Sequence, residues 1–409
     1  MENYNDKCNV CGESVSFSHS FGRMPIVNRF LTIEQFKDEF FYDLAFGFCE
    51  HCKTFQLLRL PDPNESFHAH YTYLTSENPT MVKHFKHVAH SCISPLIADK
   101  KDPFVVELGS NDGTMLQHVS VAGIRHLGIE PSENVANIAV KNGVRTRVCF
   151  FNSETAVEIV KSDGKADVIF SSNVMFPDMC ELALGVKVLL KESGICILED
   201  PYLGNVIKNA EYDQIYDEHR YVFSLNSLAY IFGTVGMEIF HVELESDIHG
   251  GSMRYFIGFK GVRDMRESVI RRWDEENNVL RLGNTDTYRQ FALECEQRKN
   301  SFVTRLRELK VKGKRVVGYG APAKSVVVCN YCRVSSDLIE CIYDNASLKR
   351  EKFLPGSHIP IKPRDKDWYK SVDYAVLFSW NYKEEIFSKE TAFKQAGGRW
   401  ILPTSGEIL

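Results

Sequence analysis

Short apolar runs alternate with longer amphipathic segments through the middle of the 409-residue chain. Each apolar run is long enough for one buried strand, and the segments between them have the apolar spacing of helices. The predicted strands cover 104–106, 127–129, 147–151, 166–170 and 194–198, and the predicted helices cover 130–142, 153–162 and 180–192. Repeated strand–helix units of this kind predict a parallel, doubly wound sheet of the α/β class.

Further elements extend this pattern toward the C-terminus. Apolar runs at 237–244 and 253–259 flank a glycine-rich hairpin, which predicts an antiparallel strand pair. Residues 263–309 have the composition of long charged helices. A strand, glycine turn and helix at 313–324, with strands at 338–345 and 373–378, predict a second, smaller doubly wound domain.

The length of the chain exceeds what one compact core usually supports, so we expect several domains. The predicted boundaries are 1–75 for an N-terminal module, 76–262 for the central α/β domain, 263–309 for a helical connection and 310–409 for the second doubly wound domain.

Two pairs of closely spaced cysteines stand in the N-terminal module. Cys8 and Cys11 form one C-x-x-C pair, and Cys49 and Cys52 form the other. Two such pairs are the usual way to place four thiolates around Zn²⁺, and four protein ligands leave no open position for catalysis. The motif predicts a structural zinc site, with four reduced thiols in a core as the alternative. Residues 28–31 and 40–46 are predicted to be short strands of this module.

A glycine-rich turn follows the first strand of the central domain, in the sequence Glu107-Leu-Gly-Ser-Asn-Asp-Gly-Thr-Met115. Gly109 and Gly113 allow the backbone to pass close to a ligand, and amides at a helix N-terminus favour an anion. Glu130 ends the next strand about 20 residues later, where an acid can bind ribose hydroxyls. The third glycine of the dinucleotide fingerprint is missing, so an ordinary strand–turn–helix corner is the alternative.

Polar residues and a glycine mark the carboxyl ends of the predicted strands, where ligands bind in sheets of this type. They are Glu107, Gly109, Glu130, Asn152, Asn173 and Asp200. Because the carboxyl ends of parallel strands meet at one edge, these residues predict an active site at that edge of the central sheet.

Tyr216, Glu218 and His219 stand close together before a predicted helix at 226–232. A histidine whose ring is oriented by a carboxylate is a usable base near neutral pH. The three side chains converge only if the segment is a turn or an irregular loop. A polar cap on the following helix is the alternative interpretation.

Tyrosines and histidines precede the central sheet. Tyr71 and Tyr73 occupy alternate positions, which is typical of a strand packed on a neighbouring domain, although their phenols could also meet a polar ligand. A helical segment at 79–96 then carries His84, His87 and His90. Because no carboxylate accompanies these histidines, we expect a solvated helix face rather than a metal site.

The second doubly wound domain has a glycine turn of its own. Gly318 and Gly320 offer backbone amides, and Lys324 offers a positive charge, for a phosphate or diphosphate. A vestigial turn without a ligand is the alternative. Cys329 and Cys332 have no second pair beside them, so we do not expect a metal there.

Composition narrows the function classes. The chain is 44% hydrophobic and 25% charged, as in ordinary globular proteins, and its net charge of −5 argues against a nucleic-acid partner. It has no apolar run long enough for a membrane helix and no signal-peptide pattern at its start. Twelve cysteines without such a signal indicate a reducing compartment, so we expect a cytoplasmic protein.

The order of these motifs resembles a known family. The series comprises C-x-x-C twice, Tyr-Thr-Tyr, Glu-Leu-Gly-Ser-Asn-Asp-Gly, Gly-Ile-Glu-Pro, Ser-Ser-Asn, Glu-Asp-Pro-Tyr, Tyr-Asp-Glu-His, His-Gly-Gly-Ser-Met-Arg and Gly-Tyr-Gly-Ala-Pro-Ala-Lys. It spans almost the whole chain and is similar to the S-adenosylmethionine-dependent sugar C-methyltransferases of the tetronitrose and mycarose type. The resemblance implies a zinc module, a class I methyltransferase core and a C-terminal Rossmann-like domain.

The resemblance also implies a reaction and its residues. A methyl passes from S-adenosylmethionine, through an enolate, to the carbon beside the ketone (C3) of a nucleotide-diphosphate 4-keto deoxysugar, usually a thymidine diphosphate ester. His219 would be the base, with Glu218 and Tyr216 binding the sugar and helping to place that base. Tyr71 or Tyr73, Asn173 and Lys324 would bind the substrate. The implied cofactor-binding residues are Glu107, Gly109, Ser110, Asn111, Gly113, Glu130, Asn152, Ser172 and Asn173.

One departure from the family pattern concerns the substrate. Relatives often carry a histidine shortly after the asparagine of the fourth strand, whereas Asn173 is followed here by Val-Met-Phe-Pro-Asp. What holds the ketone oxygen is therefore left open. An O- or N-methyltransferase on another small molecule is the first alternative, and a zinc-bearing RNA methyltransferase is a less favoured one. A single chain with closely packed domains is compatible with a monomer.

Overall fold

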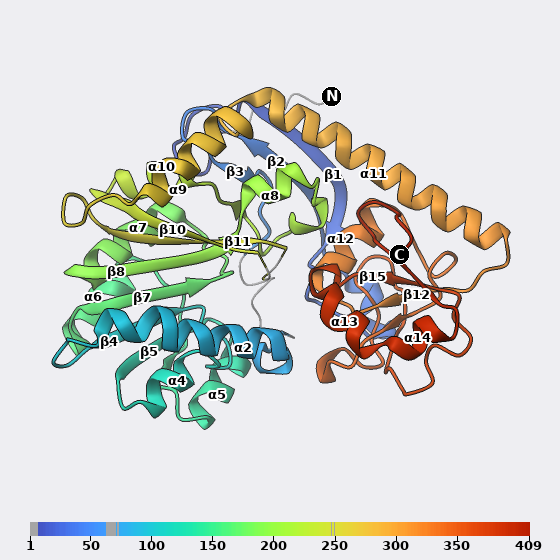
Figure 1. The fold of residues 1–409 in the computed structure, drawn as a ribbon, viewed down its shortest axis with the longest axis horizontal. Helices are drawn as coiled ribbons and strands as arrows, with labels where there is room; N and C mark the ends of the chain where they lie inside the picture. The colour runs from blue at the N-terminus through green and yellow to red at the C-terminus, as the bar shows by residue number, and fades with distance from the viewer. Residues whose placement is uncertain (1–6, 63–70, 72, 247, 249) are drawn as a thin grey trace.

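The computed structural model describes residues 7–62, 71, 73–246, 248 and 250–409. Figure 1 shows two α/β bodies side by side, with a small β-rich part above and between them. The long helix α11 (Thr285–Val311) runs across the top from one body to the other. None of the described helices combines the length and the apolar composition that crossing a membrane requires.

The central body contains a seven-stranded sheet in the order β10-β11-β8-β7-β4-β5-β6. Its strands are β4 (Phe104–Leu108), β5 (Arg125–Ile129), β6 (Thr146–Arg147), β7 (Ala166–Ser172), β8 (Leu190–Pro201), β10 (Met237–Glu245) and β11 (Ser252–Phe259). β4 to β8 pair in parallel, and β10 and β11 form the antiparallel pair at one end. This is the class I methyltransferase fold that the strand–helix pattern and the resemblance implied.

Helices cover both faces of this sheet (Figure 1). They are α4 (Leu116–Val121), α5 (Glu133–Lys141), α6 (Ser153–Asp163), α7 (Met179–Leu189), α9 (Leu225–Gly233) and α10 (Glu267–Asp274). One further continuous helical segment precedes the sheet and consists of α2 (Pro79–His87), a π-helical stretch (Val88–Ile93) and α3 (Ser94–Ile97). The predicted helices at 130–142, 153–162 and 180–192 correspond to α5, α6 and α7.

The predicted strand at 147–151 is mostly wrong. Only Thr146 and Arg147 pair with β5, whose partner residues are Gly128 and Ile129. β6 lies at the edge of the sheet, so few ladder hydrogen bonds oppose its departure. The chain then turns toward the carboxyl ends of the strands, and Phe151 becomes buried.

The N-terminal module is a four-stranded sheet in the order β1-β2-β3-β9. Its strands are β1 (Phe17–Pro25), β2 (Phe41–Phe48), β3 (Phe55–Leu57) and β9 (Tyr221–Val222). The strand expected at 40–46 corresponds to β2, but the strand expected at 28–31 is wrong, because only Leu31 forms an isolated bridge there, to Phe353. Since β9 comes from the central part of the chain, the module and the methyltransferase body share a sheet.

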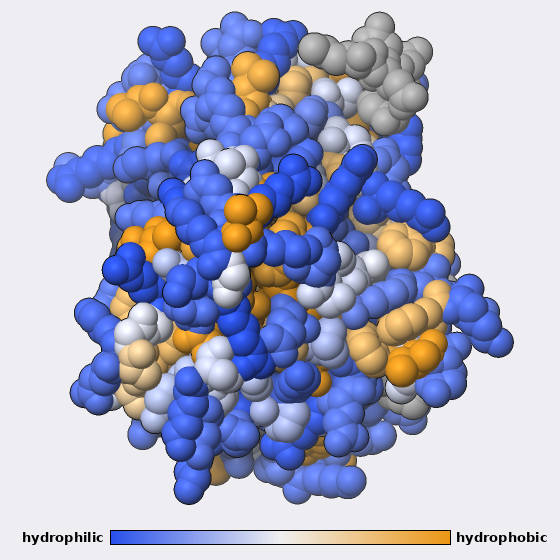
Figure 2. All heavy atoms as spheres, turned by 90° about the vertical axis from the view of Figure 1, so that its right-hand side faces the viewer, coloured by the Kyte–Doolittle hydropathy of each residue, from blue (hydrophilic) through white to orange (hydrophobic). Residues whose placement is uncertain are grey.

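The C-terminal body holds a five-stranded parallel sheet in the order β14-β13-β12-β15-β16. Its strands are β12 (Val316–Tyr319), β13 (Ile342–Tyr343), β14 (Ile361–Lys362), β15 (Tyr374–Leu377) and β16 (Arg399–Ile401), and its helices are α12 (Ala323–Tyr331), α13 (Lys383–Lys389) and α14 (Thr391–Gln395). Its outer face is largely hydrophilic, with apolar side chains in small groups (Figure 2).

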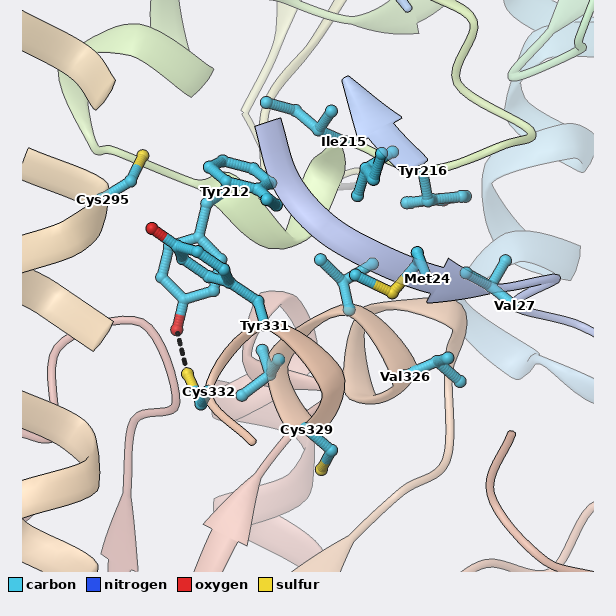
Figure 3. Close-up of a cluster of buried hydrophobic side chains, with 14 of the residues drawn as sticks. Met24, Val27, Tyr212, Ile215, Tyr216, Cys295, Val326, Cys329, Tyr331 and Cys332 are labelled. Atoms are coloured by element: carbon cyan, nitrogen blue, oxygen red, sulfur yellow. Dashed lines mark hydrogen bonds between the residues drawn. The ribbon is translucent and has the colours of Figure 1, made fainter. Parts of the chain in front are cut away.

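A continuous apolar core joins this body to the N-terminal sheet. It includes Met24 of β1, Cys295 and Leu306 of α11, and Val326 of α12. Figure 3 shows Tyr212 and Tyr331 side by side in it, with the Tyr212 hydroxyl 3.6 Å from Cys332 Sγ. Such burial, at about 25 cal/mol per Å² of apolar surface, holds the bodies against each other and so fixes the space between them.

Candidate active site

A cavity of about 460 Å³ lies between the methyltransferase body and the C-terminal body. Its walls come from every part of the chain: Tyr71 and Tyr73, the carboxyl ends of β4, β5 and β7, the segment around Tyr216, and the turn after β12. Of the residues predicted to meet at the sheet edge, Asn152 and Asp200 lie outside this lining, and Asp200 borders a small second cavity; the residues that do line it are Glu107, Gly109, Glu130 and Asn173. The edge of the second sheet faces them.

The turn after β4 has the conformation that its glycine predicted. Gly109 has φ +68, and a Cβ there would collide with the side chain of Val174. Its N–H donates to the carbonyl oxygen of Ile129 at 2.8 Å. Glu130 follows, and its carboxylate accepts hydrogen bonds from the amides of Asn111 at 3.0 Å and Ser132 at 2.8 Å. The two amides therefore hold the carboxylate next to the glycine turn, where the ribose hydroxyls of a nucleoside would bind.

Glu107 supplies the second feature of a cofactor site. Burial, with Asp112 and Glu130 nearby, raises its pKa well above the usual range. Its Oε2 atom is buried and has no hydrogen-bond partner among the described residues. An orphaned buried carboxyl group next to the turn fits a ligand that brings a positive charge, such as the ammonium of S-adenosylmethionine. Glu107, Gly109, Ser110, Asn111 and Glu130 all line the cavity.

The other residues predicted to bind the cofactor divide into two groups. Ser172 and Asn173, at the end of β7, line the cavity. Gly113 and Asn152 lie outside its lining. Gly113 has φ +80 and packs against Val144, and the Asn152 carboxamide caps α6 by accepting from the Thr155 amide at 2.8 Å. Both shape the turn and helix that border the cavity, and we place neither against the cofactor.

Tyr216 and His219 meet in an irregular loop, as the sequence required for a catalytic role, whereas Glu218 turns to other partners. His219 is buried, and its Nδ1–H donates to the carbonyl oxygen of Gln214 at 2.7 Å. Its Nε2 then accepts from the Tyr216 hydroxyl at 2.8 Å. Tyr216 and Glu218 line the main cavity, and His219 lines a small cavity behind it, next to Asn173. The histidine ring is oriented by a carbonyl and a phenol.

Glu218 has partners of its own. Its Oε1 accepts from Asn28 Nδ2 at 2.8 Å, and its Oε2 accepts from the Tyr71 hydroxyl at 3.2 Å. Burial and the charge of Asp217 raise its pKa to about 8. Tyr71 and Tyr73 lie outside the described strands, so the strand interpretation is wrong for them, and both line the cavity. Thr72, and His249 of the His-Gly-Gly motif, lie outside the described residues.

The turn after β12 repeats the geometry of the turn after β4. Gly320, with φ +78, donates its N–H to the carbonyl oxygen of Tyr343 at 2.9 Å. Asp344 accepts from the amides of Ala321 at 2.6 Å and Ala346 at 2.7 Å. The two oxygens of Asp344 are thus held in the way that those of Glu130 are held. Asp344 lines the cavity opposite Glu130.

Basic side chains surround the second turn. Lys324, on the first turn of α12, is buried and lines the cavity, as do Lys349, Arg364 and Lys389. Burial lowers the pKa of Lys324, and the charges of Asp213 and Glu211 act in the opposite direction. Sequence reasoning missed Asp344, Lys349 and Arg364 as site residues. For Asp344 a signal existed, because it ends a predicted strand shortly after a glycine turn.

The four cysteines of the N-terminal module form one cluster. Their sulfur atoms lie within 4.8 Å of one another, with Cys8 and Cys52 at 3.4 Å and Cys11 and Cys49 at 3.6 Å. Hydrogen bonds with Cys52 and Gln56 lower the pKa of Cys8, which favours the thiolate form. Four thiols this close, at the base of a small sheet, are the donor set of a structural Zn²⁺ site.

One prediction about the histidines of α2 is wrong. His87 and His90 are exposed, but His84 is buried, and its Nε2 lies 2.6 Å from Glu199 Oε1. The carboxylate partner that the sequence lacked nearby comes from β8, far along the chain. A helical pattern of histidines cannot reveal a partner at such a distance in sequence.

Comparison with known proteins matches three consecutive stretches of the chain. A zinc binding domain matches residues 8–67, a methyltransferase domain matches 83–242, and a C-methyltransferase C-terminal domain matches 247–404. The chain is 32% identical over 403 residues to the C-methyltransferase NovU of Streptomyces niveus, which covers 97% of this chain and 95% of that protein.

Solved structures resemble the methyltransferase part. The magnesium protoporphyrin IX methyltransferase of Synechocystis PCC 6803 with bound S-adenosylmethionine is 17% identical, covering 44% of this chain and 82% of that chain with a TM-score of 0.32. A methyltransferase of Anabaena variabilis is 16% identical, covering 42% and 86% with a TM-score of 0.33. The assignment itself rests on the sequence matches: the chain belongs to the C-methyltransferase family and is an S-adenosylmethionine-dependent methyltransferase with an N-terminal zinc-binding domain.

Proposed function

We propose that this enzyme transfers a methyl group to C3, the carbon beside the ketone, of a nucleotide-diphosphate 4-keto deoxysugar through an enolate. The observation that carries the proposal is the Tyr216–His219 hydrogen bond at the wall of a cavity with a nucleoside-type turn at each end. A neutral histidine and a phenol are the groups that enolate formation requires, one to take the proton and one to stabilise the oxygen.

Tyr216 and His219 divide these two tasks. Burial and the charge of Glu218 raise the pKa of Tyr216 well above its usual value, so the side chain remains a phenol and a hydrogen-bond donor. In the resting site it donates to Nε2 of His219. When a ketone oxygen takes over this hydrogen bond, the Nε2 lone pair becomes the base that removes the C3 proton. Nδ1 keeps its bond to Gln214, which holds the ring in this tautomer.

The remaining polar groups would bind and orient the sugar. Glu218, held by Asn28 and Tyr71, is placed to bind a sugar hydroxyl. Asn173 has φ +55, and its buried Oδ1 has no hydrogen-bond partner among the described residues, so the carboxamide can serve the substrate. S-adenosylmethionine, when bound at Glu107, Gly109 and Glu130, supplies an electrophilic methyl on its sulfonium. Tyr73 borders the same space.

The second turn would bind the nucleotide. Asp344 is positioned for the free sugar hydroxyl of that nucleotide, as Glu130 is for the ribose hydroxyls of the cofactor. Lys324, Lys349 and Arg364 border the same end and can neutralise a diphosphate, which carries two or more negative charges. We place a thymidine diphosphate there, in accord with the family resemblance, and from the sequence we expect a cytoplasmic protein that acts as a monomer.

The test is incubation of the enzyme and S-adenosylmethionine with a panel of thymidine diphosphate 4-ketosugars, followed by mass spectrometry and NMR. We expect a methyl on C3, and exchange of the C3 proton with deuterium from solvent when S-adenosylhomocysteine replaces the cofactor. His219→Asn should abolish both while leaving S-adenosylhomocysteine binding unchanged, with exposed His90→Asn as control. A methyl on oxygen or nitrogen, or turnover by His219→Asn, would contradict the proposal.

A further inference from the structure

A buried ionic cluster lies directly behind the cofactor side of the cavity. At its centre is Glu199 of β8, which has no exposed surface. Its Oε1 accepts from His84 Nε2 at 2.6 Å and from Ser172 Oγ at 3.1 Å. Its Oε2 accepts from Nε and Nη2 of Arg254 at 2.9 Å and 2.7 Å. One carboxylate therefore joins α2, β7 and β11 to β8.

The charge state of this cluster is well defined. Burial alone would raise the pKa of Glu199, but hydrogen bonds and charges from His84 and Arg254 outweigh it and bring the pKa to about 2. The Nη1 group of Arg254 donates in turn to Glu243 at 2.8 Å and to Cys92 Sγ at 3.3 Å. Glu199, His84 and Arg254 are buried, whereas the Glu243 side chain at the outer end of the cluster is 39% exposed.

Two of the joined elements form walls of the cofactor site. Ser172 and Asn173 end β7 and line the cavity, and the Asn173 amide also donates to the backbone oxygen of Glu199 at 2.8 Å. α2 contributes Met81 and Phe85 to the lining, on either side of His84. His84 itself, like Glu199 and Arg254, lies outside that lining.

α2 is a regular helix where His84 binds the cluster, and the chain becomes irregular directly after it. It continues into the π-helical stretch Val88–Ile93, which carries Cys92 to Arg254. Its other end contacts the C-terminal body, where the Thr80 hydroxyl donates to Glu385. π-helical turns are uncommon and occur mostly at functional sites. The helix thus borders the cavity through Met81 and Phe85 and is bound to Glu199 at its middle by His84.

Stability alone does not account for such a cluster. Replacing a buried ion cluster with apolar residues of similar size is often neutral or stabilising, because both charges must leave water. What an ionic cluster adds is direction, since charged hydrogen bonds are short and fix both partners in angle as well as in distance. Here the fixed quantity is the separation between α2 and the end of β7.

We propose that His84, Glu199 and Arg254 are positioning residues for S-adenosylmethionine: they hold α2 and the end of β7 at the separation that the cofactor occupies, without touching it. In this role His84 is needed for its Nε2–H donor. In His84→Gln, the side-chain amide N–H lies about as far from the backbone as Nε2–H of histidine and can replace it as a donor. In His84→Leu, the side chain fills a similar volume but has no donor.

The test is the dissociation constant of S-adenosylhomocysteine, measured by isothermal titration calorimetry on the full chain for His84→Leu, His84→Gln and His87→Leu. We expect His84→Leu to weaken binding roughly tenfold, the low end of what a hydrogen bond to a charged group contributes. His84→Gln should return to within about threefold of the natural protein, since it restores the donor. His87, exposed on the same helix, is the matched control and should change nothing.

Thermal unfolding of the same variants separates positioning from stability. If His84→Leu lowers the unfolding midpoint but binds S-adenosylhomocysteine as tightly as the natural protein, the cluster is structural and the proposal fails. It also fails if the leucine and glutamine variants weaken binding equally. Should His84→Leu not fold, Arg254→Lys, which keeps the charge and loses the paired hydrogen bonds, is expected to weaken binding similarly, and unchanged binding there would overturn the proposal. Because the ligand is the cofactor product, the result does not depend on the sugar substrate.

Discussion

Exchanging Asp344 for asparagine, and Glu130 for glutamine, tests whether the two ends of the cavity bind different nucleosides. Each carboxylate accepts from two backbone amides. One amide belongs to the glycine turn of the same body, and the other lies two residues after the carboxylate in the sequence. A carboxamide has a single acceptor oxygen, so one amide loses its partner and the sugar hydroxyl of the bound nucleoside loses a charged acceptor. We expect Asp344→Asn to weaken thymidine diphosphate and spare S-adenosylhomocysteine, and Glu130→Gln to do the reverse.

The size of the effect follows from the hydrogen bonds. A hydrogen bond to a charged group contributes about 1.5–3 kcal/mol, and about 1.4 kcal/mol is a tenfold change in affinity, so each variant should lose roughly 10- to 100-fold. Glu130 is 5% exposed, whereas Asp344 is only partly buried. Solvent screens the interaction of Asp344 more, so its variant should lie near tenfold and that of Glu130 nearer a hundredfold.

Isothermal titration calorimetry with both ligands on both variants gives four dissociation constants. Zinc content and the unfolding midpoint, compared with those of the natural protein, show whether the fold is kept. The reasoning is refuted if Asp344→Asn binds thymidine diphosphate as tightly as the natural protein does. It is equally refuted if either variant loses affinity for both ligands to the same extent, because the two turns would then not be separate sites.

Two further predictions concern the pH response and the metal. The pKa of Glu218 is raised from its ordinary 4.5 to about 8, so the folded state binds its proton more tightly and this stabilisation is lost as the pH rises through that interval. In denaturant unfolding, the free energy of unfolding of Glu218→Gln minus that of the natural protein should therefore rise by on the order of a few kcal/mol between pH 4.5 and 8. If this difference does not change with pH, the burial argument is contradicted. Chelation of zinc, or Cys52→Ser, should lower the free energy of unfolding by several kcal/mol with loss of bound metal; equal stability with and without zinc would make the thiol cluster incidental.

The parts of the fold that follow from local pattern were predictable from the sequence. Strands β4, β5, β7 and β8 are buried on both faces, and such strands read as continuous apolar runs whatever surrounds them. The turn at Gly109 was visible because its left-handed backbone requires glycine, and Glu130 because it directly follows the neighbouring strand. These signals lie within a few residues of the structure that they specify.

Features that depend on distant partners could not be predicted in this way. β9 is only two residues long and forms because it pairs with the edge of β3. The sequence Tyr221–Val222 by itself gives no sign of that partner. The segment at 28–31 was predicted to be a strand, but Phe30 joins the core between the bodies, Asn28 bonds Glu218, and the backbone makes only an isolated bridge. His84 presented the same difficulty, since its partner Glu199 is 115 residues away.

The catalytic loop combines both kinds of information. The sequence suggested that Tyr216 and His219 meet, since they are three positions apart, but it predicted a carboxylate rather than the Tyr216 phenol as the partner of the ring. Glu218, between them, takes its donors from Asn28 and Tyr71, which lie 190 and 147 residues away. The direction of this carboxyl is thus set by the N-terminal module, whose sheet is itself completed by β9, three residues further along the same loop. Cys49 and Cys52 lie in the connection between β2 and β3, and β3 is the strand that pairs with β9. Zinc bound there consequently supports the geometry of the site as well as the fold of the module, which is why we expect a chain without zinc to lose methyl transfer even where the methyltransferase sheet remains folded.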